Sequence, residues 1–190
     1  MNGVNIMLNH KGTLTIESDR LILRRFNIED AEDMFANWAS DTEVTKFLSW
    51  EPHNSIDVTK QVISGWINDY DKDSTYSWCI VLKDSEKVIG HISVVQLSNM
   101  HEICEIGYCL GRAFWNNGII TEALQTVIRF LFQEVGINRI QAKHDLDNPS
   151  SGKVMEKVGM MYEGLLRQSR KRKDGTYGST NIYSILKNEV

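Results

Sequence analysis

Cysteine is scarce in this sequence, and its arrangement excludes several classes of protein. The three cysteines, Cys79, Cys104 and Cys109, are odd in number, form no Cys-x-x-Cys pair and lie in apolar stretches. A disulfide scaffold needs an even set, and a structural zinc site needs closely spaced cysteine or histidine ligands. We therefore expect three free thiols in a reducing compartment. The five histidines show no ligand spacing either, so no metal site is predicted.

Long hydrophobic runs are missing as well. No stretch approaches the roughly 20 apolar residues that cross a bilayer, and residues 1–14 lack the basic start and apolar run of a signal peptide. The net charge of −4 gives no general attraction to nucleic acid or anionic membrane. The Gly-x-Ser-x-Gly elbow of serine hydrolases is absent too. We expect a cytoplasmic protein with no membrane partner and no direct nucleic-acid role.

The remaining composition is that of an ordinary globular chain. Its 190 residues are 42% hydrophobic and 24% charged, which suits one domain with a buried core. We expect a flexible tail over residues 1–12 and a single domain over 13–190. Acidic residues outnumber basic ones between Glu17 and Asp73, and the reverse holds from Gly136 onward. The first half therefore suits a cationic ligand, and the last part suits an anionic one.

Hydrophobic periodicity separates helices from strands along the chain. Helical spacing is found at 28–38, 55–70, 120–135 and 149–158. Alternating or β-branched runs predict strands at 21–24, 76–82, 88–97, 103–110, 139–144, 161–170 and 177–186. The fold class predicted from this order is α+β, with a mostly antiparallel, mixed central sheet and helices on both faces.

One strand–loop–helix connection carries a candidate anion site. The strand at 103–110 runs through Trp115-Asn116-Asn117-Gly118 into a helix beginning near Ile120. Asn and Gly tolerate the positive φ angles that turn several backbone N–H groups outward, and the helix dipole adds to their attraction for phosphate. The alternative is a plain connection between strand and helix, capped by Thr121.

A second segment combines a helix start with polar residues on an apolar face. Asn148 and Pro149 have the residue types of an N-cap and a first helical position. Asn148, Ser151 and Met155 share one face of the helix, because they are three and seven residues apart. The first turn is therefore expected to face a cleft, unless Asn148 serves only as a cap.

Both segments resemble the acetyl-CoA motifs of the GNAT superfamily of N-acetyltransferases. The Trp115 start and the Thr121-Glu122-Ala123 ending look like the RimJ/RimL-type branch, the ribosomal-protein alanine and serine N-acetyltransferases. The stretches 15–31 and 46–53 resemble the same branch, so the likeness covers about residues 14–187. It implies the GNAT fold and direct attack of a primary amine on acetyl-CoA. Ile120 stands where Gly or Ala is usual in the family, and Met155 stands where many members carry a Tyr that acts as general acid.

The resemblance also implies a set of site residues. Ser151 would assist the departing thiolate, and Glu105 would act as base through water, with Glu102 as its nearest competitor. Trp50 and His53 would line the acceptor side. Contacts to acetyl-CoA fall on the backbone of the strand end, on the phosphate loop and on the second helix: Cys109, Leu110, Trp115, Asn116, Asn117, Gly118, Ile119, Ile120, Thr121, Asn148 and Lys153.

The acceptor is left open by the sequence. Branch resemblance favours the N-terminal α-amine of a ribosomal or other protein, whereas a polyamine or aminoglycoside is the alternative amine. A non-catalytic acyl-CoA-binding module is a further alternative, and a homodimer is among the assemblies that the sequence allows. Five basic residues crowd the last hairpin, where a solvated tip is expected and a docking patch for an acidic partner is the alternative: Arg167, Arg170, Lys171, Arg172 and Lys173.

Overall fold

The computed structural model describes residues 8–190. Most of the expected tail, residues 1–7, lies outside the described residues. Residues 8–12 run along the domain, where Asn9 N donates to Val135 O at 2.9 Å and Gly12 N donates to Asp73 O at 2.7 Å. The first described residues therefore lie against the surface of the domain.

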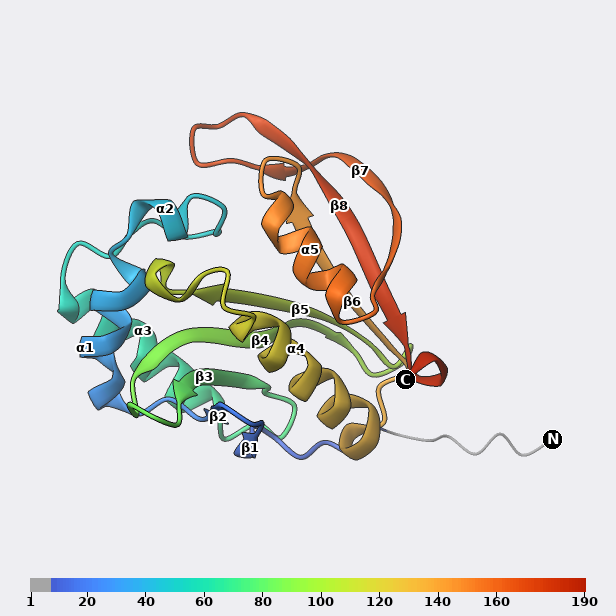
Figure 1. Cartoon of the computed structure of the whole chain (residues 1–190), viewed down its shortest axis with the longest axis horizontal. Helices are drawn as coiled ribbons and strands as arrows, with labels where there is room; N and C mark the ends of the chain where they lie inside the picture. The colour runs from blue at the N-terminus through green and yellow to red at the C-terminus, as the bar shows by residue number, and fades with distance from the viewer. Residues whose placement is uncertain (1–7) are drawn as a thin grey trace.

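A mixed sheet of eight strands forms the centre of the molecule (Figure 1). The strands are β1 (Ile16–Glu17), β2 (Leu21–Arg24), β3 (Ser77–Leu82), β4 (Val88–Ser98), β5 (Ile103–Leu110), β6 (Arg139–Asp145), β7 (Met161–Lys171) and β8 (Tyr177–Leu186). They lie in the order β1-β2-β3-β4-β5-β6-β8-β7. Neighbours are antiparallel except β5 and β6, which are parallel. This arrangement confirms the mostly antiparallel, mixed sheet.

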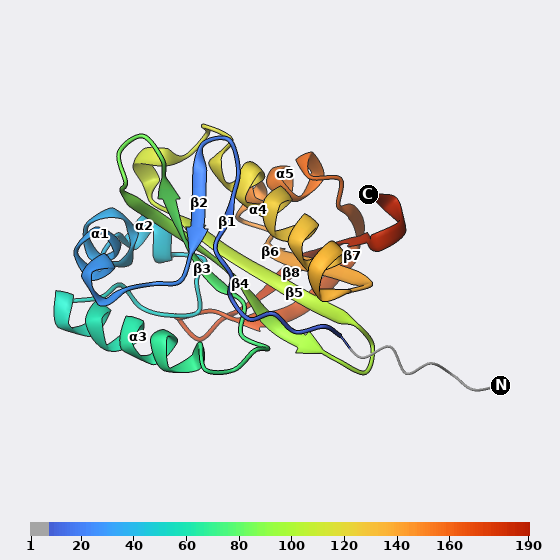
Figure 2. The ribbon, with the colours of Figure 1, turned by 90° about the horizontal axis from the view of Figure 1, so that it is seen from below.

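Helices cover both faces of the sheet (Figure 2). On one face lie a helical segment made of η1 (Ile28–Asp30), α1 (Ala31–Met34) and η2 (Phe35–Ala39), then α2 (Thr42–Thr45) and α3 (Ile56–Asp69). On the other face lie α4 (Ile119–Phe130), which continues as η4 (Leu131–Val135), and α5 (Pro149–Lys157). Two short turns, η3 (Arg112–Phe114) and η5 (Lys187–Glu189), complete the elements.

Each face of the sheet has its own hydrophobic core. The larger core packs α4 against inward residues of β2 to β6, such as Trp78, Ile106 and Ile140, which are all but fully buried. The smaller core joins Trp38 and Ile63 to the opposite face of β3 and β4. Alternation along each strand sends successive side chains to opposite faces, so the two cores share the same strands.

The junction between β5 and β6 is short. Only Ile103, Cys104 and Glu105 pair with β6, opposite Arg139, Ile140 and Gln141. Beyond Glu105 the two strands have no further paired residues within the described chain. β4 carries a bulge between Val94 and Gln96, opposite the same part of β5, and such bulges bend strands and increase their twist. The two strands are thus paired only at their first residues, and we call the region between their unpaired parts the opening, with the paired residues at its closed end.

The segment expected as a helix at 28–38 is a composite. It begins as a 3-10 turn, becomes α-helical at Ala31 and ends in a π turn over Phe35–Ala39. Asn37, within the π turn, donates from Nδ2 to Val88 O at 2.8 Å, and its own carbonyl lies close to Gly111. A Cβ on Gly111 would lie 2.8 Å from that carbonyl, so the close approach requires glycine. The π turn thereby places the first helical segment against the end of β5.

Candidate functional site

The loop before α4 has the backbone conformation that the sequence predicts. Asn116 and Gly118 both have positive φ, at 62° and 75°. Gly118 is the N-cap of α4 and the helix begins at Ile119, so Thr121, the cap in the alternative interpretation, lies inside the first turn. The first intrahelical hydrogen bond runs from Glu122 N to Gly118 O at 3.1 Å. The N–H groups of the first turn therefore face outward at a helix N-terminus, and the loop fits an anion such as a pyrophosphate.

Ile120 leaves the outer surface of this loop clear. Its side chain is 8% exposed, that of Ile119 is 5% exposed, and both belong to the larger core. The bulky residue at the position of the usual Gly or Ala therefore points inward, away from any ligand on the loop. Trp115 is exposed along one side, and its Nε1 donates to Leu110 O at 2.8 Å. That bond ties the loop to the end of β5.

Backbone groups at the end of β5 point in alternate directions. Gly111 N donates to Ile89 O, so the ladder also turns the backbone groups of Cys109 toward β4. The backbone of Leu110 points the other way, into the opening. Of the two residues expected to bind the thioester region, only Leu110 presents its backbone there. Cys109 contributes a thiol on the other face of the strand, and burial raises the pKa of this thiol to about 12.

The first turn of α5 holds Ser151 against Tyr108 of β5. The Ser151 Oγ and the Tyr108 Oη lie 2.9 Å apart, and Tyr108 Oη also donates to Ser151 O at 3.1 Å. Burial raises the pKa of Tyr108 to about 12, despite the hydrogen bond with Ser151, so the phenol keeps its proton at neutral pH. The sequence analysis did not assign Tyr108 to the site. Strand alternation from Cys104 and Ile106 was the signal that places it on the face of α5.

Other predicted residues of α5 have different surroundings. Asn148 stands at the N-cap position with Pro149 after it, but its side chain makes no capping hydrogen bond. Its amide is therefore available to a ligand. Met155 is 1% exposed and belongs to the larger core, whereas Lys153 is exposed on the helix surface. The polar first turn and the apolar remainder of this face match the sequence expectation.

Glu105 lies at the closed end of the opening, on the sheet face opposite Ser151. Its Oε2 accepts from Gln141 Nε2 at 2.9 Å and from Lys143 Nζ at 2.6 Å. Both contacts use one oxygen, so Oε1 remains available to a water molecule. The competing carboxylate, Glu102, lies in the turn before β5, where its carbonyl accepts from Arg139 N at 3.2 Å. The structure thus brings Ser151 together with Tyr108 but not with Glu105.

Trp50 and His53 pack in the segment between α2 and α3. Their ring centroids are 5.0 Å apart, and Trp50 also packs against the smaller core. The His53 Nδ1 lies 2.8 Å from Thr59 Oγ1, and burial lowers the pKa of this imidazole. His53 is therefore neutral at pH 7 and anchored to α3. The two side chains therefore fix the segment between α2 and α3 in place.

The basic hairpin tip is neither a free surface nor a simple solvated tip. Arg170 Nη2 donates to Leu48 O at 2.8 Å, and Lys173 Nζ donates to Thr45 O at 2.9 Å. Arg172 pairs with Asp145 and Asp147 at 3.1 and 2.6 Å. These bonds fasten the tip of the β7–β8 hairpin to the end of α2, to the residues just after it and to the end of β6. Figure 1 shows the β7–β8 hairpin reaching past α5 toward the side of α2. Three of the five basic residues of the hairpin are therefore bonded within the chain.

The described residues, 8–190, hold neither a metal site nor a membrane-spanning helix. No group of three or more His, Cys, Asp or Glu side chains in this part of the chain could hold a metal ion. None of its helices is long and apolar enough to cross a membrane.

Comparison with known proteins identifies relatives over nearly the whole chain. The family described as "Acetyltransferase (GNAT) domain" matches residues 20–161. A Bacillus subtilis protein named "Uncharacterized N-acetyltransferase YoaA" is 36% identical over 172 residues, which cover 90% of this chain and 96% of that protein. The ribosomal-protein-serine acetyltransferase of Escherichia coli is 31% identical over 111 residues, covering 58% of this chain and 62% of that enzyme.

The fold itself has close counterparts among solved structures. The crystal structure of an acetyltransferase (GNAT family) from Bacillus anthracis superposes with a TM-score of 0.81 at 26% identity. The superposition covers 93% of this chain and all of that one. The mixed sheet and its helices are therefore shared across the full length of this relative.

Proposed function

The chain belongs to the acetyltransferase (GNAT) family and is an acetyl-CoA-dependent N-acetyltransferase, and on this premise we propose that its acceptor is a protein N-terminal α-amine. The observation that carries the choice of acceptor is the 31% identity with the ribosomal-protein-serine acetyltransferase. Acetyl-CoA supplies a thioester-activated acetyl group. The residues of this chain would bind it, orient it and move the two protons of the reaction.

Binding is assigned to the loop at the start of α4 and to the opening beside it. The outward N–H groups of residues 116–121 would hold the pyrophosphate, since positive φ at Asn116 and Gly118 already shapes the loop. The Asn148 amide would hold the pantetheine arm, with Lys153 near the phosphates or the adenine. The backbone of Leu110 would hold the thioester carbonyl in the opening between β5 and β6.

Proton transfer is assigned to residues on the two faces of the sheet. Attack requires a neutral amine, and Glu105 would accept its proton through a water at Oε1, with Oε2 held by Gln141 and Lys143. Ser151 would donate to the leaving sulfur, and Tyr108 would orient the Ser151 hydroxyl. An acceptor entering from the side of Trp50 and His53 would reach the thioester from the face of Glu105.

A matched acceptor screen tests the proposal. Purified protein and acetyl-CoA are combined with peptides that begin with Ser, Ala or Met, with the same peptides blocked at the N-terminus, and with polyamines and aminoglycosides. Release of free thiol gives the rate, and mass spectrometry places the acetyl group. We expect turnover on free N-termini and none on blocked ones. Turnover confined to the small amines would instead assign a small-amine acetyltransferase.

A further inference from the structure

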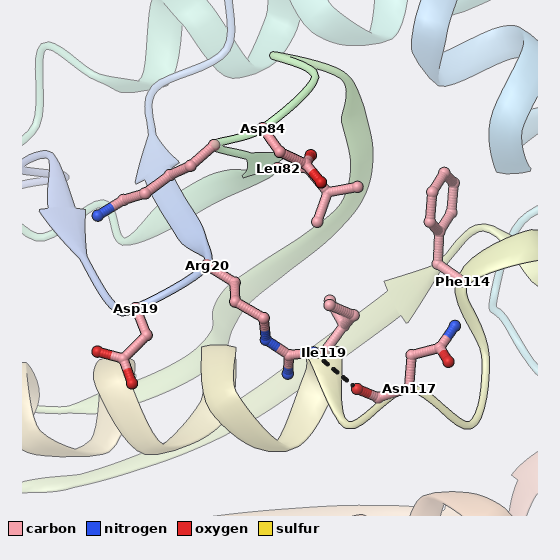
Figure 3. Close-up of a pocket in the computed structure, with 8 residues that line it drawn as sticks. Asp19, Arg20, Leu82, Asp84, Phe114, Asn117 and Ile119 are labelled. Atoms are coloured by element: carbon pink, nitrogen blue, oxygen red, sulfur yellow. Dashed lines mark hydrogen bonds between the residues drawn. The ribbon is translucent and has the colours of Figure 1, made fainter.

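Arg20, in the turn between β1 and β2, lies beside the loop that precedes α4 (Figure 3). Its Nη1 donates to Asn117 O at 3.0 Å, and its Nε donates to Glu122 Oε2 at 2.7 Å. Its backbone N–H donates to Glu122 Oε1 at 2.9 Å. One residue thus contacts the loop and the first turn of the helix together, although more than ninety positions separate them in sequence.

Glu122 is held from a second side by Ser18. The Ser18 Oγ donates to Glu122 Oε1 at 2.7 Å and accepts from Leu21 N at 3.2 Å. Burial alone would raise the pKa of Glu122, but the hydrogen bonds from Ser18 and Arg20 outweigh it and lower the pKa. The carboxylate is therefore charged at neutral pH, in the first turn of the helix whose N-terminus faces the anion site.

A negative charge at this place poses an electrostatic problem. A carboxylate in the first turn stabilises the helix, but it also repels any phosphate bound at the same N-terminus. The Arg20 guanidinium offsets the charge, and its Nη1 holds the carbonyl of Asn117, next to Gly118. Asn116 and Gly118 both have positive φ, a conformation that isolated chains populate rarely outside glycine.

We propose that Arg20 and Glu122 form a clamp that keeps the phosphate loop in its anion-binding conformation before acetyl-CoA arrives. Arg20 is a positioning residue in this account, acting through Asn117 and Glu122 rather than on the phosphates. The inference rests on the proposed binding role of residues 116–121. Loop order in the free protein lowers the entropy that binding must remove, so the clamp contributes to affinity.

The position of Arg20 also allows a different role, direct binding of phosphate. The two roles predict opposite changes of acetyl-CoA affinity in Glu122→Gln. Arg20 lines a pocket of about 350 Å³ beside the loop, together with Lys83, Phe114 and Ile119, and its side chain is 50% exposed. If Arg20 bound phosphate directly, then replacing Glu122 by Gln would free the guanidinium and strengthen binding. If Arg20 acts through the clamp, the same change weakens binding.

The test compares Arg20→Gln and Glu122→Gln with the matched control Lys83→Gln. Lys83 lines the same pocket but pairs with Glu17 at 2.8 Å. Calorimetry with acetyl-CoA measures Kd, steady-state kinetics separate KM from kcat, and hydrogen exchange of the ligand-free protein follows the amides of residues 116–120. We expect Kd and KM for acetyl-CoA to rise about tenfold in Arg20→Gln and in Glu122→Gln, as for the loss of a hydrogen bond to a charged group. We expect kcat at saturation to stay within about twofold, faster exchange in the loop, and no change in the control.

Each contrary outcome is decisive. Tighter or unchanged binding in Glu122→Gln, with weaker binding in Arg20→Gln, would overturn the clamp and favour direct contact of Arg20 with phosphate. Unchanged loop exchange in both variants would also overturn it. If the wild-type protein failed to bind acetyl-CoA, the proposed function would fall, yet the exchange comparison would still decide whether the pair orders the loop.

Discussion

In the proposed reaction the Ser151 hydroxyl meets the leaving sulfur, because Met155 is buried and cannot donate a proton. Ser151→Ala is expected to lower kcat about 100- to 10,000-fold, the usual worth of a general acid, with Kd for acetyl-CoA nearly unchanged. Tyr108→Phe keeps the ring and removes the hydroxyl 2.9 Å from Ser151, so a smaller loss of about tenfold is expected. Rapid-quench measurement of the acetylated product gives the chemical step in each variant.

The neighbouring Ser150 provides the control for this pair. It is exposed on the same first turn, and Ser150→Ala should turn over at the wild-type rate. If the chemical step in Ser151→Ala ran at the wild-type rate, Ser151 would have no catalytic role. Protonation of the thiolate would then fall to water or to Tyr108 alone.

Cys109 is expected to play no covalent part. Burial raises the pKa of its thiol to about 12, so almost none of it is thiolate at neutral pH, and the thiolate is the nucleophile. Cys109→Ala should keep most of the turnover. Incubating the wild-type protein with acetyl-CoA and no acceptor should leave residue 109 unmodified in a peptide digest, whereas an acetylated Cys109 would mean that the acetyl group passes through the enzyme.

At the scale of elements, the basic tip of the β7–β8 hairpin is bonded to the end of α2 and to Leu48 after it. Removing the two donors in the double variant Arg170→Gln/Lys173→Gln breaks bonds to Leu48 O and Thr45 O, each worth about 1 kcal/mol. Hydrogen exchange in residues 171–176 should accelerate, and KM for an acceptor peptide should rise.

The same hairpin supplies a charge-matched control in Arg167→Gln/Lys171→Gln. Both side chains are exposed, so this variant should leave exchange and KM unchanged. If instead the control variant lost affinity for an acidic assembly in a salt-dependent way, the outer charges of the hairpin would be a docking surface.

The elements most accessible to sequence reasoning were those with a strong local pattern. Alternation predicted the strands, and Asn116-Asn117-Gly118 predicted a loop with positive φ because those residue types tolerate it. The alternative of a plain connection capped by Thr121 does not fit, since Gly118 takes the cap position one turn earlier. The contact of Arg20 with Glu122 left no local signal, because it joins residues about a hundred positions apart. The insertion of β8 between β6 and β7 is likewise a property of packing, not of any one segment.

For the whole molecule, His91 makes stability depend on pH. Its Nε2 lies 2.9 Å from Ser77 Oγ, Trp66 and Phe26 pack around the ring, and Cys79 and Cys109 flank it on the neighbouring strands. Burial lowers the pKa of His91 from 6.5 to about 4. Between these values the unfolded chain binds the proton and the folded one does not, so stability falls as pH falls.

The unfolding free energy is expected to fall by up to about 3 kcal/mol. The loss is complete near pH 4 and absent above pH 6.5. Denaturant titrations between pH 4 and 8 measure it, and His91→Gln should flatten the profile over that range. His101→Gln changes an exposed histidine in the β4–β5 turn and should leave the profile intact. An equally steep profile in His91→Gln would assign the effect to other groups.

The short junction between β5 and β6 also has a mechanical meaning. Strands β1 to β5 form one antiparallel plate and β6 to β8 another, and only three residue pairs join them. This ladder closes the opening at one end. The bonds of Arg170 and Lys173 connect the β7–β8 hairpin to α2 and the residues after it. The two groups of strands are thus connected in two places, by three residue pairs of backbone and by two cationic side chains, and we expect changes at either place to alter the width of the opening.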